Sequence, residues 1–133
     1  MSSVLYVAMG GAIGASLRYG LGLGAASALG PDYPYGTLAA NVLGGFFMGL
    51  LAGWLAFKGA GLAGASGLET WRLFLGVGLL GGFTTFSSFS LEAFQMLEKK
   101  AYGPFVGYVG GSAVLAIGAL IIGMMIARKV FVS

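Results

Sequence analysis

The chain has 133 residues, of which 58% are hydrophobic and only 8% are charged, and its mean hydropathy is +0.93. Soluble domains carry about 25% charged residues, so this composition excludes a water-facing surface and indicates a single membrane domain over residues 1–133. The absence of His and Cys excludes imidazole or thiolate metal sites and disulfides, and a net charge of +3 is too small to indicate a nucleic-acid surface.

Four apolar segments are each long enough for a membrane-spanning helix, which needs roughly 20 mostly apolar residues. The first two are separated by Gly30-Pro31-Asp32-Tyr33-Pro34, whose prolines and glycine end a helix. A Gly/Ala-rich connector over residues 58–69 precedes the third, and Glu98-Lys99-Lys100 follows it. The predicted spans are approximately 4–29, 36–57, 70–97 and 103–127.

Four spans place both termini on one side of the membrane, and Lys and Arg are enriched on the cytoplasmic side of membrane proteins. The side that holds the termini and the middle connector carries four such residues, and the opposite side carries two. This weak bias favours cytoplasmic termini, and it also permits insertion in both orientations and hence an antiparallel homodimer. The residues compared are Lys58, Arg72, Arg128 and Lys129 on one side and Lys99 and Lys100 on the other.

Glycines spaced by four residues recur along the chain, and small residues at this spacing let membrane helices approach closely. With 26 glycines in the chain, the spacing also arises by chance, so it predicts close packing without identifying an interface. The series are Gly20 and Gly24; Gly45, Gly49 and Gly53; and Gly103, Gly107 and Gly111.

Two polar positions in the first two spans are candidate functional residues, because polar groups inside a bilayer are costly. Arg18 lies about 21 Å along a helix from Val4. It is therefore either an interfacial anchor or part of a positive vestibule that concentrates anions at a pore mouth. Asn41, with Thr37 one turn before it, either bonds a neighbouring helix or lines a path for an ion that needs a hydrogen-bond donor.

The third span contains a polar run that predicts a break in the helix. Five hydroxyl side chains lie among the seven residues from Thr84 to Ser90, directly after the pair Gly81-Gly82. Irregular backbone at this depth must be buried in protein or line a wet cavity, and it offers carbonyls to a small cation or N–H groups to an anion. Glu92 either anchors the hydroxyl network or lies at a pore edge. The supporting polar network is expected to include Thr37, Ser87, Ser88 and Glu92.

Aromatic and hydroxyl side chains add two further patterns. Phe86 and Phe89 are three residues apart and share a helical face. They are either ordinary packing residues or rings whose positive edges favour an anion without a fixed charge. Tyr108 and Ser112 share a face of the fourth span and predict a hydroxyl track along an otherwise apolar helix.

The run Gly81-Gly82-Phe83-Thr84-Thr85-Phe86-Ser87-Ser88-Phe89-Ser90-Leu91-Glu92 resembles the signature of the Fluc-type bacterial fluoride channels. Gly36-Thr37-Leu38-Ala39-Ala40-Asn41 and the segment from Gly10-Gly11 to Arg18 support the resemblance, which covers the whole chain in length, span count and order. It implies an all-α, multi-pass protein of the bacterial plasma or inner membrane, assembled as an antiparallel, dual-topology homodimer with a broken third helix. The implied function is passive export of cytoplasmic fluoride, not an enzymatic reaction.

The resemblance also implies roles for individual residues. Main-chain carbonyls of Gly81 and Thr84 from both copies would hold a structural sodium ion, which is not transported, at the dimer centre. Ala116 and Leu120 stand where some relatives continue the fourth-helix polar track with hydroxyls, so the extent of the track stays open. The implied fluoride pathway comprises Asn41, Phe86, Phe89, Tyr108 and Ser112, with Arg18 in the vestibule.

Three other classes fit the sequence less well. A small dual-topology multidrug exporter needs a titratable acid inside the membrane, whereas the first span contains Arg18 and no acid, and Glu92 lies late in the third span. A non-transporting assembly protein would use the glycines but gives no reason for the hydroxyl run or Asn41. An intramembrane enzyme lacks a nucleophile–base pair, because the chain has neither His nor Cys.

Overall fold

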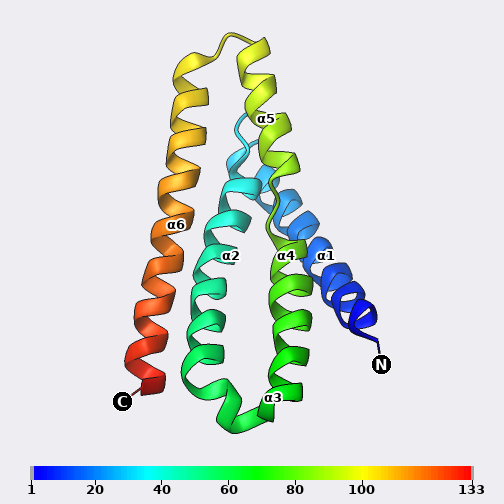
Figure 1. The fold of residues 1–133 in the computed structure, drawn as a ribbon. Helices are drawn as coiled ribbons and strands as arrows, with labels where there is room; N and C mark the ends of the chain where they lie inside the picture. Colours follow the sequence, from blue (N-terminus) through cyan, green and yellow to red (C-terminus); the bar gives the residue numbers. More distant parts are fainter. Residues whose placement is uncertain (1, 133) are drawn as a thin grey trace.

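A computed structural model of the chain describes residues 2–132, apart from the side chains of residues 58–63 and 65. Lys58, one of the cations compared above, is among those side chains. The described residues are helical almost throughout (Figure 1). In chain order the helices are α1 (Ser3–Leu29), α2 (Tyr35–Trp54), the π-helix η1 (Leu55–Gly59), α3 (Ala60–Trp71), the π-helix η2 (Arg72–Leu80), α4 (Gly81–Phe83), α5 (Ser87–Glu98) and α6 (Tyr102–Val132).

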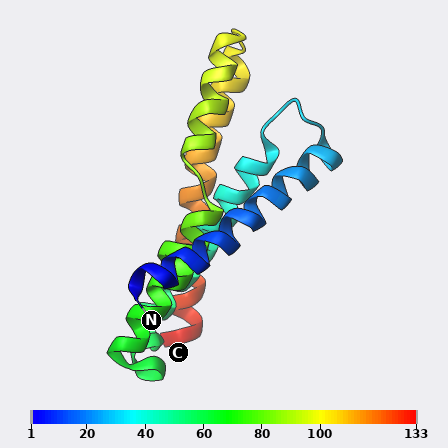
Figure 2. The ribbon, with the colours of Figure 1, turned by 90° about the vertical axis from the view of Figure 1, so that its right-hand side faces the viewer.

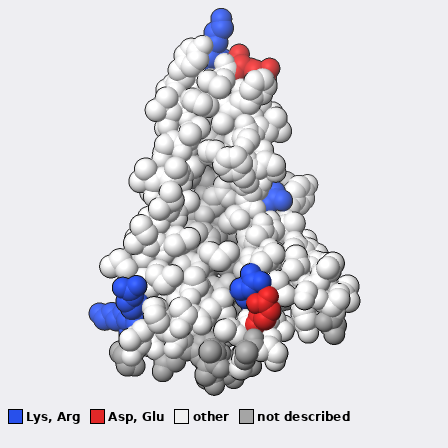
Figure 3. Space-filling view, in the orientation of Figure 1, with Lys and Arg blue, Asp and Glu red and all other residues white. Residues whose placement is uncertain are grey.

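Four helical segments of the described chain are long and apolar enough to cross a membrane, which confirms the predicted all-helical membrane fold. On the face shown in Figure 3, charged side chains gather near the two ends of the molecule and are sparse between them. The third segment begins at Ser66, before the predicted start near Thr70, and the fourth continues past residue 127 to Val132. The segments are Ser3–Leu29, Tyr35–Phe57, Ser66–Glu98 and Tyr102–Val132.

Two glycines with positive φ mark the turns that follow the first and second spans. Gly30 ends α1 with φ of 92°, and its N–H donates to the carbonyl of Ala26 at 3.0 Å. Gly64 interrupts α3 with φ of 72°, where the chain turns from the second span into the third. Both angles lie in the region that residues with a Cβ atom seldom adopt, so glycine is required at these turns.

The third span is broken, as the sequence predicts. Thr84 ends α4 in an extended conformation with φ of −84° and ψ of 157°, and α5 begins only at Ser87. In Figure 1 the ribbon narrows to a thin connection between α4 and α5. The nine-residue π-helix η2 directly before α4 was not predicted, and wide helical turns of this kind occur often at functional sites.

Close helix packing depends on only part of the glycine pattern. A Cβ atom on Gly45 would lie 2.6 Å from the Ala116 carbonyl oxygen, and one on Gly49 or Gly53 would also collide with α6. Glycine thus sets the separation of α2 and α6. The glycines of the other two predicted series have open space, with nothing within 4 Å of an added Cβ: Gly20, Gly24, Gly103, Gly107 and Gly111.

A different set of glycines brings α1 against the third span. A Cβ on Gly14 would lie 2.8 Å from the Phe83 amide nitrogen, and one on Gly82 would lie 2.7 Å from the carbonyl oxygen of Gly11. These contacts hold the middle of α1 beside η2 and α4, while α1 as a whole is inclined to the other helices (Figure 2). Arg18 on α1 is thereby placed next to the helix break.

Candidate functional site

The break in the third span leaves a series of backbone carbonyls without their helical donors. In a continuous helix each carbonyl accepts from the amide four residues later, so the interruption at Thr84 affects the carbonyls of residues 81–85. Within a membrane such groups need other partners. Two of these carbonyls, those of Gly82 and Thr85, accept from side chains on other helices.

Asn41 pairs with both backbone groups of Thr85. Its Oδ1 accepts from the Thr85 N–H at 2.8 Å, and its Nδ2 donates to the Thr85 carbonyl at 3.1 Å. These two hydrogen bonds to one residue fix the orientation of the Asn41 amide, because its oxygen faces a donor and its nitrogen faces an acceptor. One N–H of Nδ2 remains for another acceptor. Asn41 therefore bonds the broken segment of the third span, and its role in lining a path for an ion stays a prediction.

Arg18 bonds the same broken segment from α1. Its Nε donates to the Gly82 carbonyl at 3.2 Å, and the side chain is half-buried. The partner of Gly82 in a continuous helix would have been the amide of Phe86. This contact was not among the roles considered for Arg18 from sequence, and it uses only one of the three guanidinium nitrogens.

The hydroxyl run is engaged mostly in local hydrogen bonds. Thr84 Oγ1 donates to the Leu80 carbonyl at 3.0 Å and Ser90 Oγ to the Phe86 carbonyl at 2.8 Å, the usual behaviour of hydroxyls in membrane helices. Thr85 Oγ1 accepts from the Ser88 N–H at 3.1 Å, which caps the first turn of α5, and it lies 3.2 Å from Ser87 Oγ. These side chains serve to stop one helix and restart the next.

The carbonyls of Gly81 and Thr84 accept no hydrogen bond within the described part of the chain. The two amides that would reach them in a continuous helix are taken by other groups: the Thr85 N–H by Asn41 and the Ser88 N–H by Thr85 Oγ1. Both Gly81 and Thr84 line a cavity of about 500 Å³ on the outside of the single chain. Uncommitted carbonyl oxygens at a helix break are suitable ligands for a small hard cation. The residues predicted for a sodium site therefore fit such an ion.

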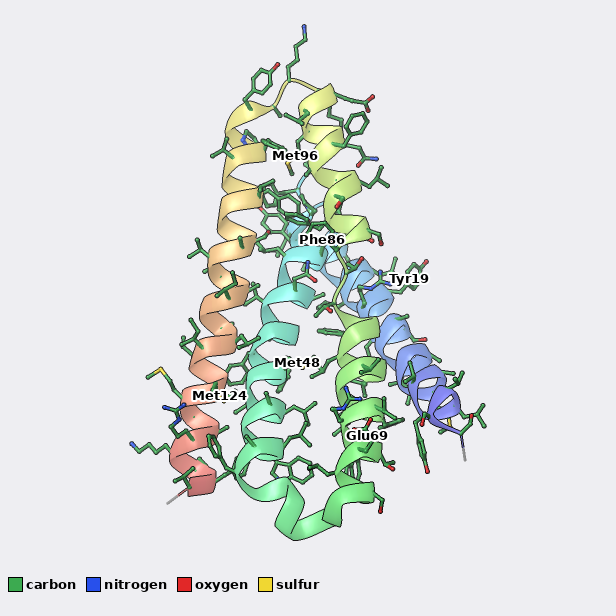
Figure 4. All side chains as sticks on the ribbon, in the orientation of Figure 1. Tyr19, Met48, Glu69, Phe86, Met96 and Met124 are labelled. Carbon is green, nitrogen blue, oxygen red and sulfur yellow. The ribbon has the colours of Figure 1, made fainter. Side chains whose placement is uncertain are left out.

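Phenylalanine and tyrosine rings form a row beside the cavity. The rings of Phe86 and Phe89 are 5.5 Å apart between centroids, and Phe89 lies 5.1 Å from Tyr108. Phe86 itself is 78% exposed at the break, and Figure 4 shows ring side chains grouped near it between α5 and α6. Phe86, Phe89 and Ser112 all line the cavity.

Two hydroxyls of α6 are buried without a hydrogen bond of ordinary geometry. Tyr108 is 0% exposed and Ser112 is 5% exposed, and neither hydroxyl oxygen makes a hydrogen bond of ordinary geometry within the described chain, although the Thr37 hydroxyl interacts with that of Tyr108. Buried polar groups are nearly always paired, and an unpaired one carries a free-energy cost. The two residues are one helical turn apart. They therefore present a short row of donors that are available to a small anion or to water.

Thr37 and Glu92 form a hydrogen-bonded pair near a second cavity of the molecule. Thr37 Oγ1 donates to Glu92 Oε1 at 2.6 Å, which joins α2 to α5. Glu92 also lines this second cavity, of about 250 Å³, together with Asp32 and Lys99. Glu92 thus bonds Thr37 and lines a cavity, and no hydrogen bond joins it to the hydroxyl run within the described chain. Its position at a pore edge stays a prediction.

Two residues at the site were not singled out from sequence. The Tyr33 ring lies edge-on to Tyr108 at 5.7 Å and lines the second cavity. In the sequence, Tyr33 is marked only by its place between two prolines, and that pattern predicts a turn rather than a site residue. Gly44 faces the Thr84 side chain so closely that any Cβ would collide with its methyl group. No spacing pattern distinguishes Gly44 from other glycines of the same helix.

Comparison with known proteins gives a consistent set of similarities. The family described as CrcB-like protein, Camphor Resistance (CrcB), matches residues 5–124. The fluoride-specific ion channel FluC of Caulobacter vibrioides (strain NA1000 / CB15N) is 54% identical over 131 residues, which are 98% of this chain and 99% of that protein. The protein of the same name from Phenylobacterium zucineum (strain HLK1) is 56% identical with the same coverage. That of Caulobacter sp. (strain K31) is 47% identical over 98% of each chain.

Proposed function

This chain belongs to the family described as CrcB-like protein, Camphor Resistance (CrcB), and we propose that it is a fluoride-selective channel for passive export of fluoride from the cytoplasm. The observation that carries the proposal is the pair of buried hydroxyls at Tyr108 and Ser112, which make no hydrogen bond of ordinary geometry within the described chain. The names of relatives that match nearly the whole chain support fluoride as the anion.

The chemistry of the site suits a small, strongly hydrated anion. A pore for such an ion must replace its water with hydrogen-bond donors and still release it. The hydroxyls of Tyr108 and Ser112 and the free N–H of Asn41 are modest donors of this kind. The rings of Phe86 and Phe89 add positive edges without a fixed charge. These side chains form the proposed fluoride pathway.

The proposed channel is an antiparallel homodimer. The cavity of about 500 Å³ on the outside of the single chain is lined by Gly81 and Thr84, whose carbonyls accept no hydrogen bond within the described chain. Lipid cannot satisfy backbone carbonyls, so this surface needs a protein cover. A second copy supplies one, and the weak charge bias permits the inverted orientation.

A structural sodium ion is proposed between the two copies. The carbonyls of Gly81 and Thr84 would hold it, because they accept no hydrogen bond in the described chain and border the cavity that a second copy would cover. The ion would supply positive charge that satisfies these oxygens and ties the copies together. It is not expected to move with fluoride.

The proposal is tested by reconstitution. Purified protein in liposomes loaded with potassium fluoride should release fluoride when the membrane potential is dissipated with valinomycin, as followed with a fluoride-selective electrode. Liposomes loaded with potassium chloride, followed with a chloride electrode, serve as the selectivity control. Release of chloride at a comparable rate, or no release of either anion, would rule out a fluoride-selective channel.

A further inference from the structure

The pair Gly81-Gly82 opens α4, the short helix that ends at the break, and its amides still lie in helical turns. Its carbonyls have no helical donors, because the Thr85 N–H donates to Asn41 and the chain is extended at Thr84 before α5 begins at Ser87. Glycine has the widest choice of backbone angles, so the helix alone constrains the directions of these carbonyls less than it would at other residues. A carbonyl that is to bind an ion at this position needs another constraint on its direction.

Arg18 provides a constraint on the plane next to Gly81. Its Nε donates to the Gly82 carbonyl at 3.2 Å, and the packing of α1 keeps the arginine in place. A Cβ on Gly82 would lie 2.7 Å from the Gly11 carbonyl oxygen, so a larger residue would push the helices and this bond apart. Asn41 fixes the other side of the break through Thr85.

The division of the carbonyls is selective. Side chains take the carbonyls of Gly82 and Thr85, whereas those of Gly81, Phe83 and Thr84 accept no hydrogen bond within the described chain; of these three residues, Gly81 and Thr84 border the cavity. Each free carbonyl therefore has a neighbour in sequence whose peptide plane is fixed by another helix.

We infer that Arg18 is a positioning residue for the cation site: its Nε–H holds the Gly82 peptide plane and thereby directs the free Gly81 carbonyl toward the ion. This role differs from that of a vestibule charge, because it depends on a donor at the position of Nε and not on the positive charge. The inference rests on the proposed function only through the proposed sodium ion.

Three substitutions separate the donor from the charge. Arg18→Gln keeps an N–H donor the same number of bonds from the backbone as Nε but carries no charge. Arg18→Lys keeps the charge but has a methylene at that position, and Arg18→Met has neither. Arg72→Met is the matched control, because Arg72 is exposed and pairs only with Glu69 among the described ion pairs.

The readout is the thermal stability of the purified protein in detergent as sodium replaces N-methylglucamine at constant ionic strength. A ligand at free concentration L that binds only the folded state raises the free energy of unfolding by RT ln(1 + L/Kd), so the rise in stability with sodium concentration yields the dissociation constant for sodium. We expect Arg18→Met and Arg18→Lys to raise this dissociation constant about tenfold, the effect of losing one charge-assisted hydrogen bond. Arg18→Gln and Arg72→Met should stay within about twofold of the original protein.

Three outcomes would overturn the inference: no response of the original protein to sodium, the same sodium dissociation constant in all the Arg18 variants, or the original dissociation constant in Arg18→Lys but not in Arg18→Gln. If Arg18→Met does not fold, the comparison of Gln with Lys decides. Fluoride release from liposomes at saturating sodium separates the two proposals. If fluoride is not released but the Arg18 variants rank in sodium affinity as expected, the channel alone is refuted. If fluoride is released normally but the variants do not rank in this way, the positioning role alone is refuted.

Discussion

Replacing Asn41 by Leu tests the link between the helix break and conduction. Leucine has nearly the same shape as asparagine, so the change removes the two hydrogen bonds to Thr85 with little change in packing. Each buried group left without a partner costs about 1–3 kcal/mol. Because the Thr85 groups are only partly buried, the free energy of unfolding should fall by about 2–4 kcal/mol.

The same substitution removes the free N–H of Asn41 from the proposed pathway. A hydrogen bond to a charged group contributes about 1.5–3 kcal/mol, and each 1.4 kcal/mol of barrier is a factor of ten in rate. We therefore expect fluoride release to fall about 10- to 100-fold in the liposome assay. The control is Thr70→Val, because Thr70 is remote from the break and bonds only the Ser66 carbonyl of its own helix.

Asn41→Asp refines the interpretation. A carboxylate can still accept from the Thr85 N–H but has no N–H for the Thr85 carbonyl, and its charge repels an anion. We expect release to fall at least as far as in Asn41→Leu while the proposed dimer stays intact by size-exclusion chromatography. Release at the original rate, in either variant, would remove Asn41 from the pathway, and unchanged thermal stability in Asn41→Leu would refute the argument from the two hydrogen bonds.

Three further predictions use the same assays. Phe89→Ile should sharply reduce fluoride release without dissociating the proposed dimer, because an aliphatic side chain has no positive ring edge; unchanged release would assign Phe89 to packing alone. Gly45→Ala should lower the free energy of unfolding by about 1–3 kcal/mol, because the added Cβ would lie 2.6 Å from a carbonyl of α6. Gly20→Ala, at a position with nothing within 4 Å, is its control, and equal stability of the two would contradict the packing argument. Thr37→Val should lower the free energy of unfolding by about 1–2 kcal/mol, because it removes the 2.6 Å hydrogen bond to Glu92. An unchanged free energy of unfolding would mean that this pair does not stabilise the fold.

The spans and the break could be predicted because their causes are local in sequence. An apolar segment of sufficient length must span the membrane, and Gly81-Gly82 followed by hydroxyls cannot continue an ordinary helix without partners. The π-helix η2 could not be predicted, since its wider turns depend on how the third span packs against α1. Helical spacing says nothing about such packing.

The partners of the polar side chains depend on distance across helices, which a single sequence does not report. Arg18 is separated from Gly82 by 64 residues, and Asn41 from Thr85 by 44. The polarity of both side chains predicts a free-energy cost in lipid, but the sequence leaves alternative roles open for each of them. It could not identify the backbone atoms that they contact. The hydroxyl run shows the reverse: four of its five side chains form hydrogen bonds within a few residues, so its role in the helix break could be predicted from the sequence.

The broken backbone connects assembly to conduction. A carbonyl left unsatisfied in lipid costs several kcal/mol. The chain avoids this cost at Gly82 and Thr85, because the side chains of Arg18 and Asn41 donate hydrogen bonds to these carbonyls. It does not do so at Gly81 and Thr84, so a lone copy in lipid carries that cost. A second copy with a shared cation would remove it, and covering the same cavity would enclose the rings and hydroxyls beside it. On the proposed function, the groups that make a single chain unstable in lipid are therefore the ones that favour the assembled pore.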